Sequence, residues 1–302
     1  MRGLARLAMR GPMFAAGSAA VLALAAMVFG LLLVPSGAVI ALTTLRFGPR
    51  EGLKIAAIAA SFVLVVGLGL GQGIAASLML VTMAWLPAWL LACTLTLRRA
   101  QDWPLLLAAF LVLVYAAGLR IAVGDVTAFW RDRLKTLFEL MAKDAGARFT
   151  AEQIEFIVAQ SHSWTVVALF CMLAAVILLA RWWQAELYNP GGFGAEFRDL
   201  RLPRSATILA GALALAFALG GKGVLILDLA GDAFVLLVVL FALQGLAVVH
   251  AMARVRGLAG AWLTSLYVVL LLVPQVAGPI LATTGLADDV VDFRHLRGAR
   301  QP

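Results

Sequence analysis

Charged residues are scarce in this chain of 302 residues, where Asp, Glu, Lys and Arg together make up 13%. The apolar fraction is 63%, whereas ordinary globular proteins have about 45 to 50% apolar and about 25% charged residues. There are only 2 cysteines, Cys93 and Cys171. Both lie inside apolar runs at a spacing that matches no metal site, so we expect neither a disulfide nor a zinc centre. This composition excludes a soluble globular fold and favours one integral membrane domain over residues 1–302.

Motifs of the common enzyme classes are also missing, since HExxH, the P-loop and GxSxG do not occur. His162, His250 and His295 are scattered, and we expect them at the membrane interface and not in a catalytic centre. Asp288-Asp289-Val290-Val291-Asp292 has the DDxxD form that holds Mg²⁺ and pyrophosphate in prenyl-transferring enzymes, but no second acidic motif completes such a site. We therefore expect a solvated C-terminal tail, no enzymatic activity, no metal site and no cofactor.

Long apolar runs separated by short charged loops fill nearly the whole chain. A bilayer core of about 30 Å needs about 20 helical residues, and a helix satisfies its own backbone hydrogen bonds in lipid. The sequence predicts an all-α, polytopic transmembrane bundle of about eight spans. These are residues 12–34, 53–71, 74–97, 103–122, 163–182, 205–226, 233–252 and 258–285.

The first apolar stretch, residues 12–44, is longer than the about 7 to 15 residues of a signal-peptide core, so we expect a retained helix. It is also too long for one crossing and contains Pro35-Ser36-Gly37. We expect the chain to break there and to return through a re-entrant half-helix, residues 36–46, which keeps the three N-terminal arginines in the cytoplasm. Irregular backbone at that depth is tolerated where protein or a water-filled cavity covers it. Pro35 to Gly37 is thus either a cavity wall or a plain interfacial turn.

The basic residues are distributed unevenly between the two sides of the predicted bundle. The loops near residues 46–54, 98–102, 181–204 and 254–256 hold 11 basic and 5 acidic residues, whereas residues 123–161 hold 5 basic and 6 acidic ones. The positive-inside rule places the first set, and the N-terminus, in the cytoplasm of a bacterial inner membrane. The net charge of +8 therefore indicates orientation in a membrane and no nucleic-acid partner.

Two tryptophans lie inside a predicted span and not at its ends. Trp85 and Trp89 flank Pro87 in the third span and share a helix face at i, i+4. They either pack at a kink or form a stacking wall for a ligand.

Polar groups near the membrane are functional candidates by default. Gln244 lies within the seventh span, and Lys222, Asp228 and Asp232 surround the outer turn before it. Lys222 either pairs with one of these aspartates or belongs to a polar vestibule for a ligand. The candidate ligand cavity comprises Trp85, Trp89, Gln244, Lys222 and Asp228.

Residues 126–143 have an apolar face and a charged face and predict an amphipathic helix. Thr150 to Gln153 has the form of a capping box for a second helix that leads into the fifth span. These outer helices, residues 126–161, either lie on the lipid headgroups or cover a cavity as a lid.

The most distinctive segment is the predicted cytoplasmic loop 183–204. Asn189-Pro190-Gly191-Gly192 is a tight-turn signal, because Pro fixes φ and Gly allows positive φ. Aromatic side chains precede and follow the turn, and a binding role competes with that of an anchored turn. The candidate residues are Arg181, Trp183, Gln184, Tyr188, Asn189, Pro190, Gly191, Gly192, Phe193, Glu196 and Phe197.

The run RWWQAELYNPGGFGAEFRDLRLPR and the segment GLAVVHA at 245–251 resemble the YybS-like predicted membrane proteins of bacteria. This resemblance implies an inner-membrane protein related to the substrate-binding subunits of energy-coupling-factor vitamin transporters. We therefore expect a component that binds or transports an unidentified small molecule within the lipid bilayer. The alternative is a scaffold that docks a membrane or cytoplasmic protein partner on the loop 183–204.

Overall fold

The computed structural model describes residues 2–69, 71, 73–144, 149–219, 225–258 and 260–294, so Lys222 and His295 lie outside the described residues. Within these ranges the chain is all-α and contains no strand. The helices are α1 (Arg2–Ala8), α2 (Pro12–Ala25), η1 (Gly30–Leu32), α3 (Leu33–Phe47), α4 (Pro49–Gly69), α5 (Ile74–Arg98), α6 (Asp102–Val123), α7 (Val126–Asp144), α8 (Ala151–Tyr188), α9 (Gly192–Arg198), α10 (Arg204–Leu219), α11 (Leu225–Val255), α12 (Gly260–Leu272) and α13 (Pro274–Val291).

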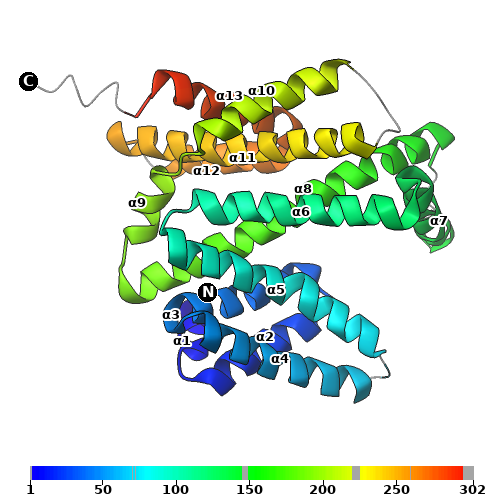
Figure 1. Ribbon diagram of the computed structural model, residues 1–302, viewed down its shortest axis with the longest axis vertical. Helices are drawn as coiled ribbons and strands as arrows, with labels where there is room; N and C mark the ends of the chain where they lie inside the picture. The colour runs from blue at the N-terminus through cyan, green and yellow to red at the C-terminus, as the bar shows by residue number, and fades with distance from the viewer. Residues whose placement is uncertain are drawn as a thin grey trace, which may run out of the picture.

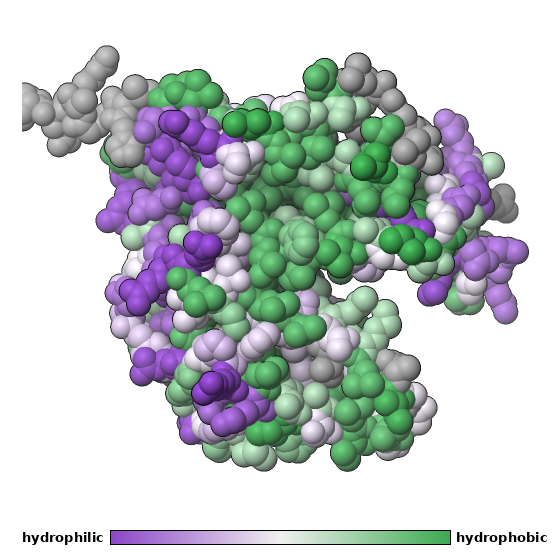
Figure 2. All heavy atoms as spheres, viewed as in Figure 1, coloured by the Kyte–Doolittle hydropathy of each residue, from purple (hydrophilic) through white to green (hydrophobic). Residues whose placement is uncertain are grey.

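The long helices run between two ends of the molecule, one marked by α9 and the other by α7 (Figure 1). The first and last described residues, Arg2 and Arg294, lie at the α9 end. Arg2 forms an ion pair of 2.6 Å with Glu186 near the end of α8, and Arg294 donates to the carbonyl of Arg198 in α9 at 2.6 Å. Hydrophilic residues gather at both ends of this view, and a hydrophobic band lies between them (Figure 2).

Six of the described helices are long and apolar enough to cross a membrane. They are the η1–α3 segment, α4, α5, α6, α8 and α11, whereas α2, α10 and α12 are shorter apolar helices. The predicted spans 74–97 and 103–122 coincide closely with α5 and α6. This pattern is that of a membrane-embedded helical protein, with a band of exposed apolar side chains where lipid would lie.

The predicted break at Pro35 to Gly37 is wrong. The first stretch breaks earlier, at residues 26–32, and α3 runs without interruption through Ser36. Pro35 is the third residue of α3, where its missing N–H costs nothing because N–H groups of the first turn have no partner within the helix. Gly37 allows close contact with α8, since a Cβ added there would lie 3.1 Å from Val176 Cγ2.

The two helices on either side of this break, α2 and α3, pack against each other as a hairpin. Arg2 contacts Glu186, and the Arg46 guanidinium lies 4.2 Å from the centroid of the Tyr188 ring. Both ends of the hairpin therefore lie beside the same end of α8. The chain returns to the side where it started, as the re-entrant model requires, but by a different route.

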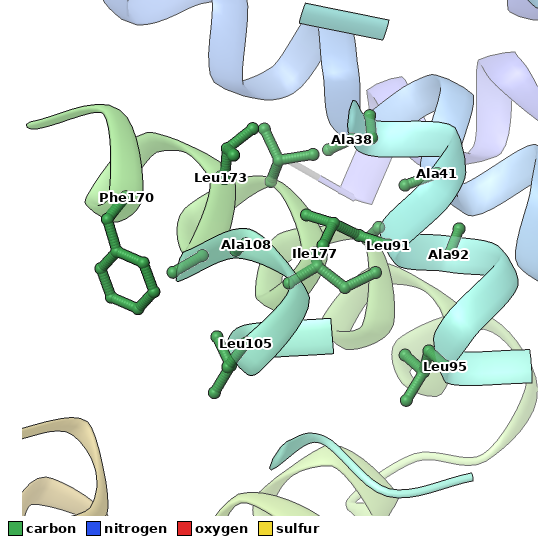
Figure 3. Packing of buried hydrophobic residues seen from close by; sticks show 14 of the residues in the cluster. Ala38, Ala41, Leu91, Ala92, Leu95, Leu105, Ala108, Phe170, Leu173 and Ile177 are labelled. Carbon is green, nitrogen blue, oxygen red and sulfur yellow. The ribbon is translucent and has the colours of Figure 1, made fainter. Parts of the chain in front are cut away.

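The core is centred on α3, which is buried at every residue from Ser36 to Thr44. It packs against α2, α4, α5 and α8. Figure 3 shows its alanines, among them Ala38 and Ala41, facing leucines and isoleucine of α5 and α8. Small side chains let these helix axes approach closely, as is usual for helices in lipid.

The predicted span 258–285 is wrong as a single helix. Val273 adopts φ −135 and ψ 59, and Pro274 begins α13 as its first residue. Proline disfavours α conformation in the residue before it, which ends α12 at this point. The result is a second helical hairpin, α12–α13, whose second helix packs most extensively against α11.

One further prediction is confirmed and one is revised. The second outer helix leads into the fifth span as predicted, because α8 runs unbroken through 38 residues and begins with the predicted capping box of Thr150 and Gln153. The segment 183–204 is mostly helical and not a loop, since α8 continues to Tyr188 and α9 follows the turn. An aromatic-rich chain at the bilayer surface satisfies its backbone groups best as helix.

Candidate functional site

Three ionisable side chains meet where α6, α8 and α11 pack together near the α7 end. Nη1 of Arg120 lies 2.5 Å from Oδ2 of Asp232 and 2.7 Å from Nε2 of His162. Oδ2 of Asp232 and Nε2 of His162 are 3.2 Å apart. The side chains are 12%, 6% and 10% exposed, respectively. Burying ionised groups in a membrane protein is costly, and such groups mark functional sites more often than structural ones. We call Arg120, His162 and Asp232 the charged triad.

The triad is not saturated with hydrogen bonds. Because Nη1 of Arg120 donates to Nε2 of His162, that nitrogen accepts, and the neutral ring carries its proton on Nδ1. Nδ1 is buried and has no partner among the described residues. Arg120 makes its hydrogen bonds to described residues through Nη1 alone, which leaves Nε and Nη2 as spare donors. The triad can therefore donate to an oxygen that the described residues do not supply.

Apolar helices surround the triad, and the molecular surface is hollowed nearby. Val158 and Val166 of α8, Ala116 of α6 and Leu236 of α11 are all buried within about one helical turn of the triad residues. Figure 2 shows the surface hollowed between α7 and the neighbouring ends of α4 and α5, beside the end of α6 that carries Arg120.

Reasoning from the sequence missed this triad. Arg120 lies at the end of the predicted fourth span, His162 was expected at the interface, and Asp232 was one of two aspartates expected either to pair with Lys222 or to line a polar vestibule. The structure pairs Asp232 with Arg120. An arginine inside one apolar run and an aspartate beginning another were the available signal, since opposite charges at one depth of a membrane tend to pair.

The segment that carries the distinctive motif is held firmly at the α9 end. Gly191 adopts φ 86, which glycine tolerates, and thereby turns the chain from α8 into α9. Arg181 binds Glu196 through two hydrogen bonds, and Gln184 donates to the carbonyl of Leu45 at 3.3 Å. The turn itself is exposed at residues 188–191. The segment is therefore an ordered surface feature whose tip is exposed.

Aromatic side chains fix α9 against the bundle. Phe193 and Phe197 stack with ring centroids 6.0 Å apart, and Phe197 meets His250 of α11 edge to face at 5.6 Å. His250 in turn accepts or donates a hydrogen bond of 3.1 Å with the Tyr267 hydroxyl of α12. These contacts link the motif to the segment GLAVVHA, so the two distinctive segments of the sequence lie side by side.

Trp183 is fully buried at the same end, and its indole Nε1 has no partner among the described residues. A cavity of about 30 Å³ adjoins it, lined by Arg2, Ala5, Arg6, Trp183, Glu186 and Leu187. That volume holds one or two water molecules. Trp183 therefore serves mainly to seal α1 against α8.

The residues of the predicted ligand cavity do not come together. Trp85 donates to Ser36 Oγ at 2.9 Å in the contact between α3 and α5, and Trp89 donates to the carbonyl of Pro49 at 2.8 Å. Gln244 lies in the separate contact between α11 and α13. Asp228 is half-buried one turn before Asp232, and Lys222 is outside the described residues. Of this set, only Asp228 lies near the charged triad.

Gln244 links three segments near the α9 end. Its Oε1 accepts from the backbone N–H of Leu202 at 2.8 Å, and its Nε2 donates to the carbonyl of Gly285 at 2.8 Å and to Asp289 Oδ1 at 2.9 Å. All hydrogen-bonding groups of this buried amide thus have partners. The arrangement ties the chain after α9 to the α11–α13 pair.

The expectation of a solvated tail at Asp288 to Asp292 is wrong. Asp288 is fully buried and pairs with Arg201 at 3.2 Å and with Arg294 at 3.1 Å. Burial lowers the pKa of Arg294, whereas the hydrogen bond donated to Asp292 raises the pKa of Arg201. Helix α13 continues to Val291 and packs against α11. Asp288 and Asp292 therefore form ion pairs with arginines, and Asp289 accepts hydrogen bonds from Gln244 and Thr207. No cluster of three or more metal-ligating side chains occurs in the described part of the chain.

Comparison with protein-family models, with curated proteins and with solved structures finds no match to this chain. The function must therefore be inferred from the residues themselves.

Proposed function

We propose that this protein binds and transports a small molecule across a membrane, and that the charged triad is the part of the site that handles charge. The observation that supports this proposal is the meeting of Arg120, His162 and Asp232 from three separate helices with donors to spare. A purely structural ion pair gains little once desolvation is counted, so stability alone is a weak reason for such a cluster. We also propose that the protein is not an enzyme.

We further propose that the α9 end faces the cytoplasm of a bacterial inner membrane, as the distribution of basic residues favours. In this arrangement α4, α5, α6, α8, α10 and α11 cross the bilayer, while the hairpins α2–α3 and α12–α13 enter from the cytoplasmic side and turn back. Helix α10 has 16 residues and is about 24 Å long, close to the thickness of the core. Six crossings and two hairpins replace about eight full spans and leave both termini inside.

Native mass spectrometry of the purified protein tests the proposed function. We expect the wild-type protein to carry a bound small molecule, and Arg120→Gln to lose it. The matched control is Arg131→Gln, which removes an exposed pair with Glu155 and should retain the molecule. Absence of any bound molecule from the wild type, or its retention by Arg120→Gln, would contradict the proposal.

A second candidate function is a scaffold that docks a protein partner on the motif segment, supported by the ordered but exposed turn at residues 188–191. A photocrosslinking residue at exposed Ala195 should then capture a discrete partner in native membranes, whereas one at exposed Ala128 of α7 should not. Gly191→Val should weaken capture, because a β-branched residue does not tolerate the φ of 86 found there. Equal capture from both positions would remove this candidate.

A further inference from the structure

We infer that the charged triad takes a monoanionic ligand, of the carboxylate class and with an apolar body, together with one proton. This inference rests on the proposed function and names its substrate class. It follows from the way the three side chains share their hydrogen bonds and from the balance of charge in a buried site.

The three side chains of the triad are electrically neutral as a group. Arg120 carries a positive charge, Asp232 a negative charge, and His162 is neutral while its Nε2 accepts from Arg120. Adding an anion alone would leave an uncompensated charge in an apolar surrounding, which is strongly unfavourable. An anion can therefore enter only with a positive charge, and the imidazole is the group that can receive a proton.

The second step is a rearrangement that keeps every charge paired. When His162 gains a proton on Nε2, it can no longer accept from Arg120, but it can donate to Asp232 Oδ2, which is already only 3.2 Å away. Asp232 is then neutralised by the imidazolium, and Arg120 is released. The guanidinium has two further nitrogens with which to form a bidentate pair with a carboxylate. One proton and one anion enter, and two neutral pairs result.

Other charged groups face this part of the molecule. Helix α6 contributes Arg120, and α11 contributes Asp232 and the half-buried Asp228 one turn away. Helix α7 packs on α8 and brings Arg131, which is paired with Glu155 of α8. Among the described residues near His162, Arg120 is thus the guanidinium that can bind a ligand. A single guanidinium neutralises a monoanion but not a dianion.

The surroundings indicate what the rest of the ligand is like. The described residues beside the triad on its own helices are valine, alanine and leucine, namely Val158, Val166, Ala116 and Leu236. An apolar body gains free energy by leaving water for such a surface. A carboxylate attached to a ring or a hydrocarbon chain therefore fits better than a small hydrophilic acid.

Calorimetric titration of the purified protein with benzoate tests the inference, with benzamide as the uncharged analogue. Titrations in two buffers of different ionisation enthalpy count the protons taken up. We expect benzoate to bind the wild type with uptake of about one proton near neutral pH, and benzamide to bind at least about tenfold more weakly. Arg120→Gln should weaken benzoate binding at least about tenfold.

Asp232→Asn supplies the decisive comparison. Without the negative charge of Asp232, Arg120 needs no proton on His162 to be free, so this variant should bind benzoate as well as the wild type and take up no proton. Because Asn keeps the shape of Asp232 and an oxygen that accepts from Arg120, Asp232→Asn should fold like the wild type. Proton uptake retained in Asp232→Asn would overturn the inference.

The remaining outcomes separate this inference from the proposed function. If the wild type retains a purified molecule through Arg120 but ignores benzoate, or binds it without a proton, the inference is wrong and the transport function stands. If neither a purified molecule nor benzoate binds, both are wrong.

Discussion

Gln244 shows how much of this structure depends on a single buried side chain. It is fully buried and bonds the backbone of Leu202, the carbonyl of Gly285 and the carboxylate of Asp289. Two of these partners are backbone groups. Removing the amide leaves the N–H of Leu202 without its partner and takes one hydrogen bond from each of the other two groups, of which Asp289 keeps its bond from Thr207.

We predict that Gln244→Leu lowers the stability of the purified protein by about 2 to 4 kcal/mol, since each unsatisfied buried group costs about 1 to 3 kcal/mol. Gln184→Leu is the matched control, because Gln184 is half-buried and makes one longer hydrogen bond of 3.3 Å. Thermal unfolding followed by circular dichroism measures both. A smaller loss in Gln244→Leu than in Gln184→Leu would show that the three bonds do not hold the segments together.

Sequence reasoning located Gln244 but not its partners. An amide inside an apolar run is visible from composition, whereas Leu202 and Asp289 lie far away along the chain. The same is true of Trp85, whose bond to Ser36 joins helices that hydropathy treats as independent. Such partners depend on which helices pack together, and a pattern of apolar runs does not contain that information.

The pairing of α11 with α13 depends on two glycines that face each other. A Cβ added at Gly245 would lie 1.9 Å from the carbonyl oxygen of Leu281, and one added at Gly285 would lie 2.1 Å from that of Phe241. No real Cβ atom tolerates such distances, so the two helices approach as closely as their backbones permit. Close approach of this kind replaces the hydrophobic effect as the main attraction between helices in lipid.

We predict that Gly285→Ala forces these helices apart and destabilises the protein by about 1 to 3 kcal/mol, as overpacking does in cores. Gly278→Ala, in the same helix, meets nothing within 4 Å and should leave the stability unchanged or slightly higher, because alanine favours helix. Thermal unfolding of both variants in lipid nanodiscs compares them directly. Equal effects would contradict the close crossing.

At the level of helices, the sequence predicts the interiors better than the ends. Residues 74–97 and 103–122 are strongly apolar, and the structure forms one helix over each, although Pro87 lies inside the first. The two wrong predictions, the break at Pro35 and the single helix over 258–285, each involve a proline, and the outcome depends on where that proline falls. Pro35 sits in the first turn of α3 and is harmless, whereas Pro274 follows an apolar run and begins a new helix. Only packing distinguishes a proline that starts a helix from one that breaks it.

The whole molecule has two different ends, and its proposed orientation is open to direct test. Ala195 and Ala128 are both exposed, on α9 and α7. After Cys93→Ala and Cys171→Ala, we predict that an impermeant thiol reagent labels Ala128→Cys in intact cells and labels Ala195→Cys only after lysis. The reverse pattern would invert the topology and place the triad on the cytoplasmic side.

The sequence predicts the charged triad least well, because its three residues are far apart in the chain. Each residue alone is ordinary for the end of a membrane helix, and only the packing of α6, α8 and α11 makes them a site. Their buried position near the α7 end, among apolar side chains, is why we propose that they bind the charged group of a ligand.

Replacing the whole triad with apolar residues tests most directly whether it exists for function. In Arg120→Met, His162→Leu and Asp232→Leu combined, no unpaired charge remains, and buried ion pairs exchanged for apolar residues usually leave stability unchanged or raise it. We predict that this triple variant unfolds at the same or a higher temperature than the wild type in nanodiscs, and that native mass spectrometry finds it without the bound molecule. A triple variant that fails to fold, or that folds and still holds the molecule, would contradict a functional role for the triad.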